Sequence, residues 1–265
     1  MPAALLATAC VLFAGSAFAQ TGQPTGCESL VVPSYMGPGP GWDTMIASAP
    51  KTGAADRILI VNPASGPGMA ARPGFRDVVQ RVKRTGQKVY GYVPTGYGAR
   101  SMQSVEDRVR KYVDWYGVDG IFFDEVSDKA PLVPRYYQPL VTFTTSQIRG
   151  GGVMLNNGTF PAAAYATIKV PAGSKFQLVV FEHDYRSFTK RSFTVPRWVA
   201  QHPSSMFVSI VYAASASQLP EVLRLSAERN FGTVYVTDKD LPNPYGVLPD
   251  YWDALSRATQ PGCSR

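Results

Sequence analysis

Eight short apolar runs separated by longer polar segments constrain the fold of this 265-residue chain more than any other feature. Runs such as 58–61 and 178–181 are rich in valine, isoleucine, leucine and phenylalanine, and they do not alternate polar with apolar residues. This pattern is typical of strands that are buried on both faces of a parallel sheet. The expected strands cover residues 30–35, 57–62, 88–93, 120–124, 152–156, 177–182, 206–212 and 232–238.

Helical periodicity appears in three of the segments between these runs, at 74–85, 102–116 and 217–230. In the first, Phe75, Val78, Val79 and Val82 share one face, and Gly86 follows as a stop signal. In the second, the inward face is formed by Val105, Val109, Tyr112 and Val113, and the stop signal is Gly117. Eight strands interleaved with helices predict a single-domain (β/α)₈ barrel. An open doubly wound sheet is the alternative, although the first strand is not followed by a G-x-G-x-x-G turn.

The amino-terminal segment is typical of a secretory signal peptide. Residues 3–19 are almost wholly apolar or small, and Ala17-Phe18-Ala19 fits an A-x-A cleavage site. We therefore expect a signal peptide at 1–19, a leader at 20–29, and a barrel domain at 30–265 of a protein secreted to an extracellular or periplasmic compartment. A buried amino-terminal helix is the alternative interpretation.

Cleavage after residue 19 removes Cys10 and leaves Cys27 and Cys263, an even count in a chain that enters an oxidising compartment. We expect these two cysteines to form a disulfide. The bond would hold the two ends of the domain together, as a closed barrel requires.

Charge and motif content disfavour several other classes of function. The formal net charge is +7, but the basic residues are dispersed, which argues against a nucleic-acid partner. The histidines His183 and His202 occur without an H-E-x-x-H motif, and the chain has no G-x-S-x-G motif. No later stretch approaches the length of a membrane span. We expect a monomer without a metal or an organic cofactor.

Polar and aromatic side chains end the predicted strands. In a (β/α)₈ barrel the carboxyl ends of all the strands meet on one face, so these residues converge there. Carboxylates, amides and flat rings together suit a carbohydrate ligand. The residues are Tyr35, Asn62, Tyr92, Asp124, Glu125, Asn156, Glu182, Tyr212 and Asp238.

Two of these strands end on carboxylates, Asp124 with Glu125 and then Glu182. Glycoside hydrolysis needs one carboxylic acid to protonate the leaving oxygen and a second carboxylate as nucleophile or base. A strand-terminal carboxylate can also be a helix cap or a surface ion-pair partner. Two apolar strands that both end on carboxylates favour the catalytic interpretation.

Several aromatic residues fall in predicted loops, and most of them are expected to serve ordinary packing. Because they lie at or after the first and third strands, Tyr35, Trp42, Tyr92 and Tyr97 are our candidates for stacking against sugar rings.

Four ordered motifs resemble the spherulin-4-like family: Pro33-Ser34-Tyr35 through Trp42, residues 62–68, residues 91–100 and residues 119–125. The resemblance implies a secreted (β/α)₈ glycoside hydrolase acting on exopolysaccharides rich in N-acetylgalactosamine, such as galactosaminogalactan. It carries the catalytic carboxylates over onto Asp124, Glu125 and Glu182. Asn156-Asn157-Gly158 departs from the asparagine-proline-glycine turn expected after the fifth strand.

We therefore predict a secreted endo-glycoside hydrolase of an N-acetylgalactosamine-containing polysaccharide. Glu125 and Glu182 are the expected acid/base and nucleophile pair, and Asp124 is expected to orient the substrate or to tune the pKa of a neighbour. Two alternatives remain open: a noncatalytic carbohydrate-binding or cell-surface barrel, and an enzyme that acts on another glycan.

Overall fold

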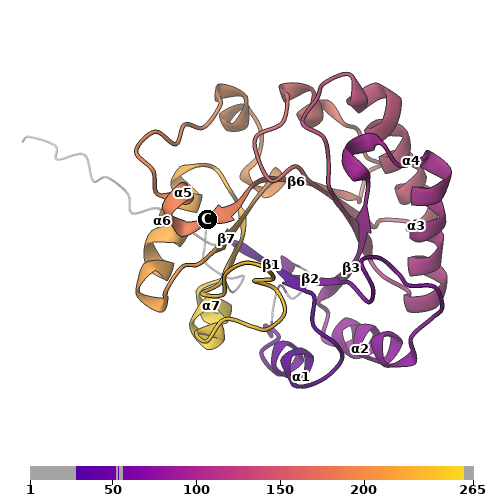
Figure 1. Ribbon diagram of the computed structural model, residues 1–265, viewed down its shortest axis with the longest axis horizontal. Coiled ribbons are helices and arrows are strands. Elements are labelled where there is room, and N and C mark those ends of the chain that lie inside the picture. The colour runs from indigo at the N-terminus through magenta and orange to yellow at the C-terminus, as the bar shows by residue number, and fades with distance from the viewer. Residues whose placement is uncertain (1–27, 52, 54–55, 260–265) are drawn as a thin grey trace, which may run out of the picture.

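Eight parallel strands close into a barrel in the computed structural model, which describes residues 28–51, 53 and 56–259 (Figure 1). Each strand pairs with its neighbour in the sequence, and β1 pairs with β8 through Ser29 beside Thr233 and Leu30 beside Val234. The predicted (β/α)₈ fold is thus confirmed. The strands are β1 Ser29–Ser34, β2 Ile58–Val61, β3 Lys88–Pro94, β4 Gly120–Asp124, β5 Gly152–Asn156, β6 Lys175–Asp184, β7 Phe207–Tyr212 and β8 Thr233–Val236.

The strands are buried on both faces, as their continuous apolar composition predicts. Every residue of β2, β5, β7 and β8 is buried. The strand β6 is longer than predicted, and its pairing with β7 shifts register between Val179 and Phe181. The strand continues through His183 to Asp184, beyond the end expected at residue 182.

Helices cover the outside of the barrel, as Figure 1 shows. The predicted helices at 74–85, 102–116 and 217–230 correspond to α2, α3 and α6 to within three residues, and Gly117 ends α3 in the left-handed conformation with φ 65°. The helices are α1 Pro40–Ala47, α2 Pro73–Arg84, α3 Met102–Tyr116, α4 Gln138–Gln147, α5 Tyr185–Phe188, α6 Leu219–Glu228 and α7 Trp252–Ala258.

The outer layer is less regular after β5 and β6. The β5–β6 connection holds only the 3₁₀ segment Ala163–Thr167, and the β6–β7 connection holds the one-turn helix α5 and the 3₁₀ segments Arg197–Gln201 and Ser204–Met206. The strand order is nevertheless complete, so all eight strand ends still face the same mouth.

Several expectations fall on residues outside the described ranges. These are the signal peptide at 1–19, most of the leader, Cys10 and the pair Cys27 and Cys263. Among the described residues, no helix is both long and apolar enough to cross a membrane.

Candidate active site

Asp124 and Glu182 meet at the mouth of the barrel through a shared amide. Asp124 is the last residue of β4, and Glu182 lies near the end of β6. Between them, at the end of β5, Asn156 Nδ2 donates to Asp124 Oδ1 at 2.8 Å and to Glu182 Oε2 at 2.5 Å. The two carboxylate oxygens therefore cannot lie further apart than these two hydrogen bonds laid end to end.

Backbone hydrogen bonds hold Asn156 in the orientation that this arrangement needs. The side-chain oxygen of Asn156 accepts from the backbone N–H of Gly158 at 3.0 Å. Because that contact requires the oxygen, the amide group must turn its two N–H donors toward the carboxylates. The Gly158 carbonyl in turn accepts from the backbone N–H of Glu182 at 3.0 Å, which ties the β5 turn to β6.

Each carboxylate also accepts a hydrogen bond from a tyrosine. Tyr92, on the neighbouring strand β3, donates to Asp124 Oδ2 at 2.6 Å. Tyr245, in the loop after β8, donates to Glu182 Oε1 at 2.5 Å. Tyr35 lies between the two tyrosines and packs edge-on against each ring at 5.4 Å. Three packed tyrosine rings thus surround the two carboxylates, and two of these tyrosines hold them by hydrogen bonds.

A cavity of about 380 Å³ opens over this network. Its lining consists of Asp124, Glu182, Tyr35, Tyr212 and the segment from Leu241 to Tyr245. Tyr212 stacks on His183 with ring centroids 5.8 Å apart. The cavity therefore offers paired carboxylates and aromatic faces, the combination that a sugar ring needs.

The surroundings of Glu182 favour its neutral form. Burial raises the pKa of this carboxyl first, and the charge of Asp124 raises it further, while the hydrogen bonds from Tyr245 and Asn156 act in the opposite direction. Burial and the charge of Glu182 also raise the pKa of Tyr245 far above its ordinary value. Tyr245 therefore stays a hydrogen-bond donor, and Glu182 is suited to hold a proton.

Glu125 directly follows Asp124 at the end of β4, and its contacts differ from those of Asp124. It adopts a left-handed backbone conformation with φ 52°, and its Oε2 accepts from the backbone N–H of Gly96 at 3.1 Å. Its carbonyl accepts from Thr95 Oγ1 at 2.7 Å and from the backbone N–H of Tyr97 at 2.6 Å. Glu125 is thus bound to the β3–α3 loop, and the residue that shares a hydrogen-bond donor with Glu182 is Asp124.

Trp42, which the sequence predicts to stack against sugar rings, faces the core instead. Trp42 lies in α1 and is fully buried, and its Nε1 donates to the Met36 carbonyl at 3.3 Å. The prediction failed because 35–42 reads as a loop in sequence, whereas Pro40 begins a helix that turns the indole into the core.

Three other predicted substrate-binding residues lie apart from the cavity. Asn62 accepts from the backbone N–H of Gly66 at 2.9 Å and shapes the β2–α2 loop. Asp238 accepts from Lys239 Nζ at 3.2 Å and from the backbone N–H of Asp250. Tyr97, 67% exposed, stands on the β3–α3 loop. Of the predicted substrate-binding set, the structure gathers Tyr35, Tyr92, Asn156 and Tyr212 around the two carboxylates.

Tyr245 is a residue of the site that the sequence did not predict. It lies seven residues beyond the expected end of the last strand, in a segment rich in proline and asparagine, and its role depends on how that loop folds back over the mouth. The aromatic residue itself is the only local signal, and the distance to Glu182 cannot be read from it.

No metal centre is evident in the described part of the chain, where no three or more histidine, cysteine, aspartate or glutamate side chains are grouped in a way that could hold an ion. The acidic pair instead receives its hydrogen bonds from one amide and two phenols.

Fold and site together define a (β/α)₈-barrel protein with paired carboxylates at the carboxyl-terminal mouth. The chain belongs to spherulation-specific family 4, whose profile matches residues 29–259.

Two similar proteins extend this assignment. Spherulin-4 from Physarum polycephalum is 31% identical over 220 residues, which are 79% of this chain and 63% of that protein, so the chain spans about 63% of the length of this relative. The crystal structure of Aspergillus clavatus Sph3 in complex with GalNAc matches with a TM-score of 0.72 and 22% identity, over 89% of this chain and 98% of that one. At this identity the second likeness shows the barrel fold.

Proposed function

We propose that this protein is a secreted endo-glycoside hydrolase that cleaves an N-acetylgalactosamine-containing exopolysaccharide of the galactosaminogalactan type. The observation that carries the proposal is the network in which Asn156 binds Asp124 and Glu182 while one tyrosine binds each carboxylate. Support for the sugar comes from the Aspergillus clavatus relative, which was crystallised with GalNAc. Support for secretion comes from residues 1–19, which have the composition of a signal peptide.

In this proposal Glu182 is the general acid. Its raised pKa keeps the proton available for the leaving glycosidic oxygen as that bond breaks. Asp124, held in place by hydrogen bonds from Tyr92 and Asn156, faces the positive charge that develops at the anomeric carbon. This assignment replaces Glu125 by Asp124 in the catalytic pair.

The short separation of the two carboxylates favours retention of the anomeric configuration. Retaining glycosidases hold their carboxyl groups about 5 to 5.5 Å apart, whereas inverting enzymes leave about 6.5 to 9.5 Å for a water molecule. Asp124 Oδ1 and Glu182 Oε2 both accept from Asn156 Nδ2, so their separation does not exceed the shorter of these ranges. Proton NMR of the newly released anomeric centre tests this expectation.

The decisive experiment measures new reducing ends released from an N-acetylgalactosamine-rich polymer. We expect the wild-type protein to release oligosaccharides, and Glu182→Gln and Asp124→Asn each to lower the rate by about a hundredfold or more. Ser187→Ala, at a residue of α5 that does not line the cavity, is the control, and thermal unfolding verifies that each variant folds. Near-wild-type rates in Glu182→Gln would exclude this mechanism. Binding without any release of reducing ends would favour the noncatalytic carbohydrate-binding barrel instead.

Substrate selectivity is tested by the same assay on a glucosamine-rich polymer and on a galactose-rich polymer. The proposal expects release from the N-acetylgalactosamine-rich polymer at a rate at least tenfold above either. Product size separates the modes of cleavage, because an endo-acting enzyme releases a range of oligosaccharides and an exo-acting enzyme releases small units from one end.

A further inference from the structure

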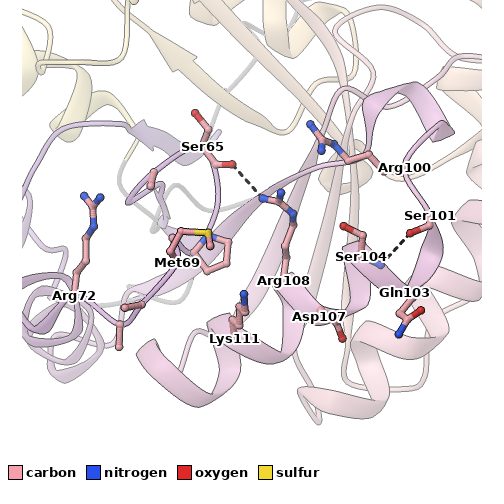
Figure 2. A pocket seen from close by; sticks show the side chains of 15 residues that line it. Ser65, Met69, Arg72, Arg100, Ser101, Gln103, Ser104, Asp107, Arg108 and Lys111 are labelled. Carbon is pink, nitrogen blue, oxygen red and sulfur yellow. Dashed lines mark hydrogen bonds between the residues drawn. The ribbon is translucent and has the colours of Figure 1, made fainter.

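A second and larger cavity lies between the β2–α2 loop and the part of α3 from Gln103 to Lys111. Its volume is about 870 Å³, and Figure 2 shows its side chains. We call it the basic groove, because its wall holds four cationic side chains, Arg72, Arg100, Arg108 and Lys111. The catalytic network described above contributes none of its lining residues.

The positive charge of the basic groove is not neutralised by neighbouring carboxylates. Within the described ranges, none of its four cationic side chains forms an ion pair. Arg72 donates to the Pro63 carbonyl at 2.8 Å, and Arg108 lies 3.5 Å from the Ser65 carbonyl, a long contact that leaves most of its donors free.

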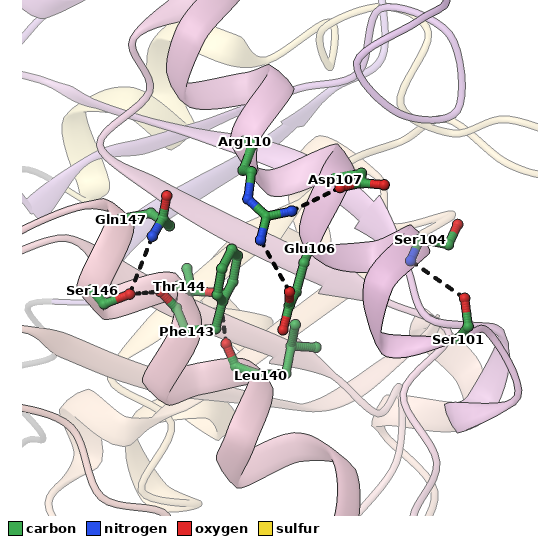
Figure 3. A network of polar contacts seen from close by, with 10 residues as sticks. All are labelled: Ser101, Ser104, Glu106, Asp107, Arg110, Leu140, Phe143, Thr144, Ser146 and Gln147. Carbon is green, nitrogen blue, oxygen red and sulfur yellow. Dashed lines mark hydrogen bonds and ion pairs between the residues drawn. The ribbon is translucent and has the colours of Figure 1, made fainter.

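Asp107, the carboxylate that lines the groove, is occupied elsewhere. It forms an ion pair with Arg110 at 2.7 Å, and Arg110 also binds Glu106 at 3.2 Å and lies 4.8 Å over the ring of Phe143 (Figure 3). The charge of Asp107 is therefore directed toward Arg110 on the α4 side of the helix, and the groove keeps its excess of cations.

Arg108 spans the groove from α3 to the β2–α2 loop. Arg108 and Lys111 lie three residues apart on one face of α3, and Figure 2 shows Arg108 reaching toward Ser65 on the opposite loop. A side chain at Gly66 would place its Cβ 2.7 Å from Arg108 Nη1, so the glycine at this point leaves room for the guanidinium. Pro67, Ala70 and Ala71 supply apolar surface beside Gln103 and Ser104.

A short backbone path connects the basic groove to the catalytic carboxylates. The backbone N–H of Arg100 donates to the Thr95 carbonyl at 3.2 Å, and the backbone N–H of Thr95 donates to the Asp124 carbonyl at 2.9 Å. The exposed ring of Tyr97 stands on the same loop. The loop that follows β3 thus lies between the residues that line the basic groove and the end of β4.

We propose that the basic groove binds a carboxylate-bearing sugar unit of a polysaccharide. Guanidinium groups bind planar carboxylates in two-point geometry, amide and hydroxyl groups suit sugar hydroxyls, and the apolar surface of Pro67, Ala70 and Ala71 suits the C–H face of a ring. A cavity of this size accommodates a ligand of about two sugar rings. The inference goes beyond the proposed function, because binding in the groove requires neither Asp124 nor Glu182.

Titration calorimetry with tetragalacturonate as the probe tests this proposal. We expect measurable binding by the full chain at low salt, a loss of at least tenfold in the double variant Arg108→Gln with Lys111→Gln, and no difference between the wild type and this variant toward a neutral galactose tetrasaccharide. Arg81→Gln with Arg224→Gln is the matched control, since it removes the same charge from residues remote from the groove and is expected to keep affinity within about twofold.

Three outcomes would overturn the proposal: no binding of tetragalacturonate by the wild-type chain, an equal loss in the control variant, or tighter binding of a single-stranded oligonucleotide of matched charge. Glu182→Gln is expected to bind the probe like the wild type. Failure of hydrolysis and failure of the groove are therefore separate results, and thermal unfolding verifies that the groove variants fold.

Discussion

At the scale of single residues, Glu182 is distinguished by two effects that act in the same direction. Burial and the charge of Asp124 both raise the pKa of its carboxyl, and Tyr245 and Asn156 offset part of that rise. The neutral form therefore extends to higher pH than in an exposed glutamate, and activity that needs its proton is lost as pH rises through the raised pKa.

The first prediction concerns Tyr245→Phe. Removing the hydrogen bond that lowers the pKa of Glu182 raises this pKa further, so the alkaline limb of the kcat/KM profile should move to higher pH. Tyr212→Phe, which also lines the cavity but makes no hydrogen bond to Glu182, should leave the limb in place. An alkaline limb that stays in place or moves to lower pH in Tyr245→Phe would show that another group controls it.

The second prediction separates the two neighbouring acids. A glutamine at position 125 can still accept the hydrogen bond from Gly96, so Glu125→Gln should keep at least tenfold more activity than Glu182→Gln in the reducing-end assay. Equal losses would return Glu125 to the catalytic pair. Ser187→Ala, at a residue that lines neither the cavity over the carboxylates nor the basic groove, is the control.

At the scale of elements, close approach of β3, β4 and β5 depends on glycines packed around one tyrosine. A Cβ built at Gly152 would lie 1.6 Å from the Tyr90 hydroxyl, and one at Gly120 would lie 2.4 Å from the Gly152 carbonyl. Any larger residue must push the strands or the Tyr90 ring aside. These contacts lie at the other end of the barrel from Asp124, so they affect stability rather than catalysis.

The third prediction follows from this packing. Gly152→Ala should lower the stability by about 3 kcal/mol and the Tm by roughly 6 to 12 °C for a chain of this size. Gly37→Ala, where an added Cβ meets nothing within 4 Å, should change the Tm little. Tyr90→Phe in the Gly152→Ala background removes the nearest clashing atom and should recover part of the loss. A Tm equal to that of the wild type in Gly152→Ala would contradict the packing.

At the scale of the whole molecule, one buried arginine joins the first and the last described parts of the chain. The guanidinium of Arg57, buried just before β2, donates to the Ser48 carbonyl at 2.8 Å and to Ser256 Oγ at 2.9 Å. It also lies 5.7 Å over the ring of Trp252. One side chain thus joins the end of α1, the start of β2 and the last helix α7, which brings the carboxyl-terminal helix back to the first strands.

The fourth prediction concerns the expected disulfide between Cys27 and Cys263, which lies outside the described residues and stays a prediction. By the entropy of the unfolded chain, such a bond stabilises the fold by up to about 5 kcal/mol. Reduction should therefore lower the Tm, and the unfolded, unreduced protein should react with no thiol reagent once residues 1–19 are removed. An unchanged Tm after verified reduction, or two titratable thiols before it, would exclude the bond.

Much of the molecule could be predicted because each prediction used a local pattern. The eight strands follow from their apolar runs, and α2 and α3 follow from helical periodicity with glycine stops. The convergence of Asp124, Asn156 and Glu182 needed only the rule that parallel strand ends share a face. Trp42 escaped this reasoning because a proline-rich segment that reads as a loop begins a helix instead.

By itself, the sequence determined the barrel, the mouth and the chemical types of side chain that gather there, because strand burial and strand direction are properties of short segments. Only the tertiary structure decided which carboxylate faces Glu182. Adjacent residues at a strand end point in different directions, and the left-handed backbone of Glu125 turns its side chain to the Gly96 amide while Asp124 faces Asn156. The hydrogen bond from Tyr245 and the basic groove likewise arise from loops that meet in space, which no local pattern records.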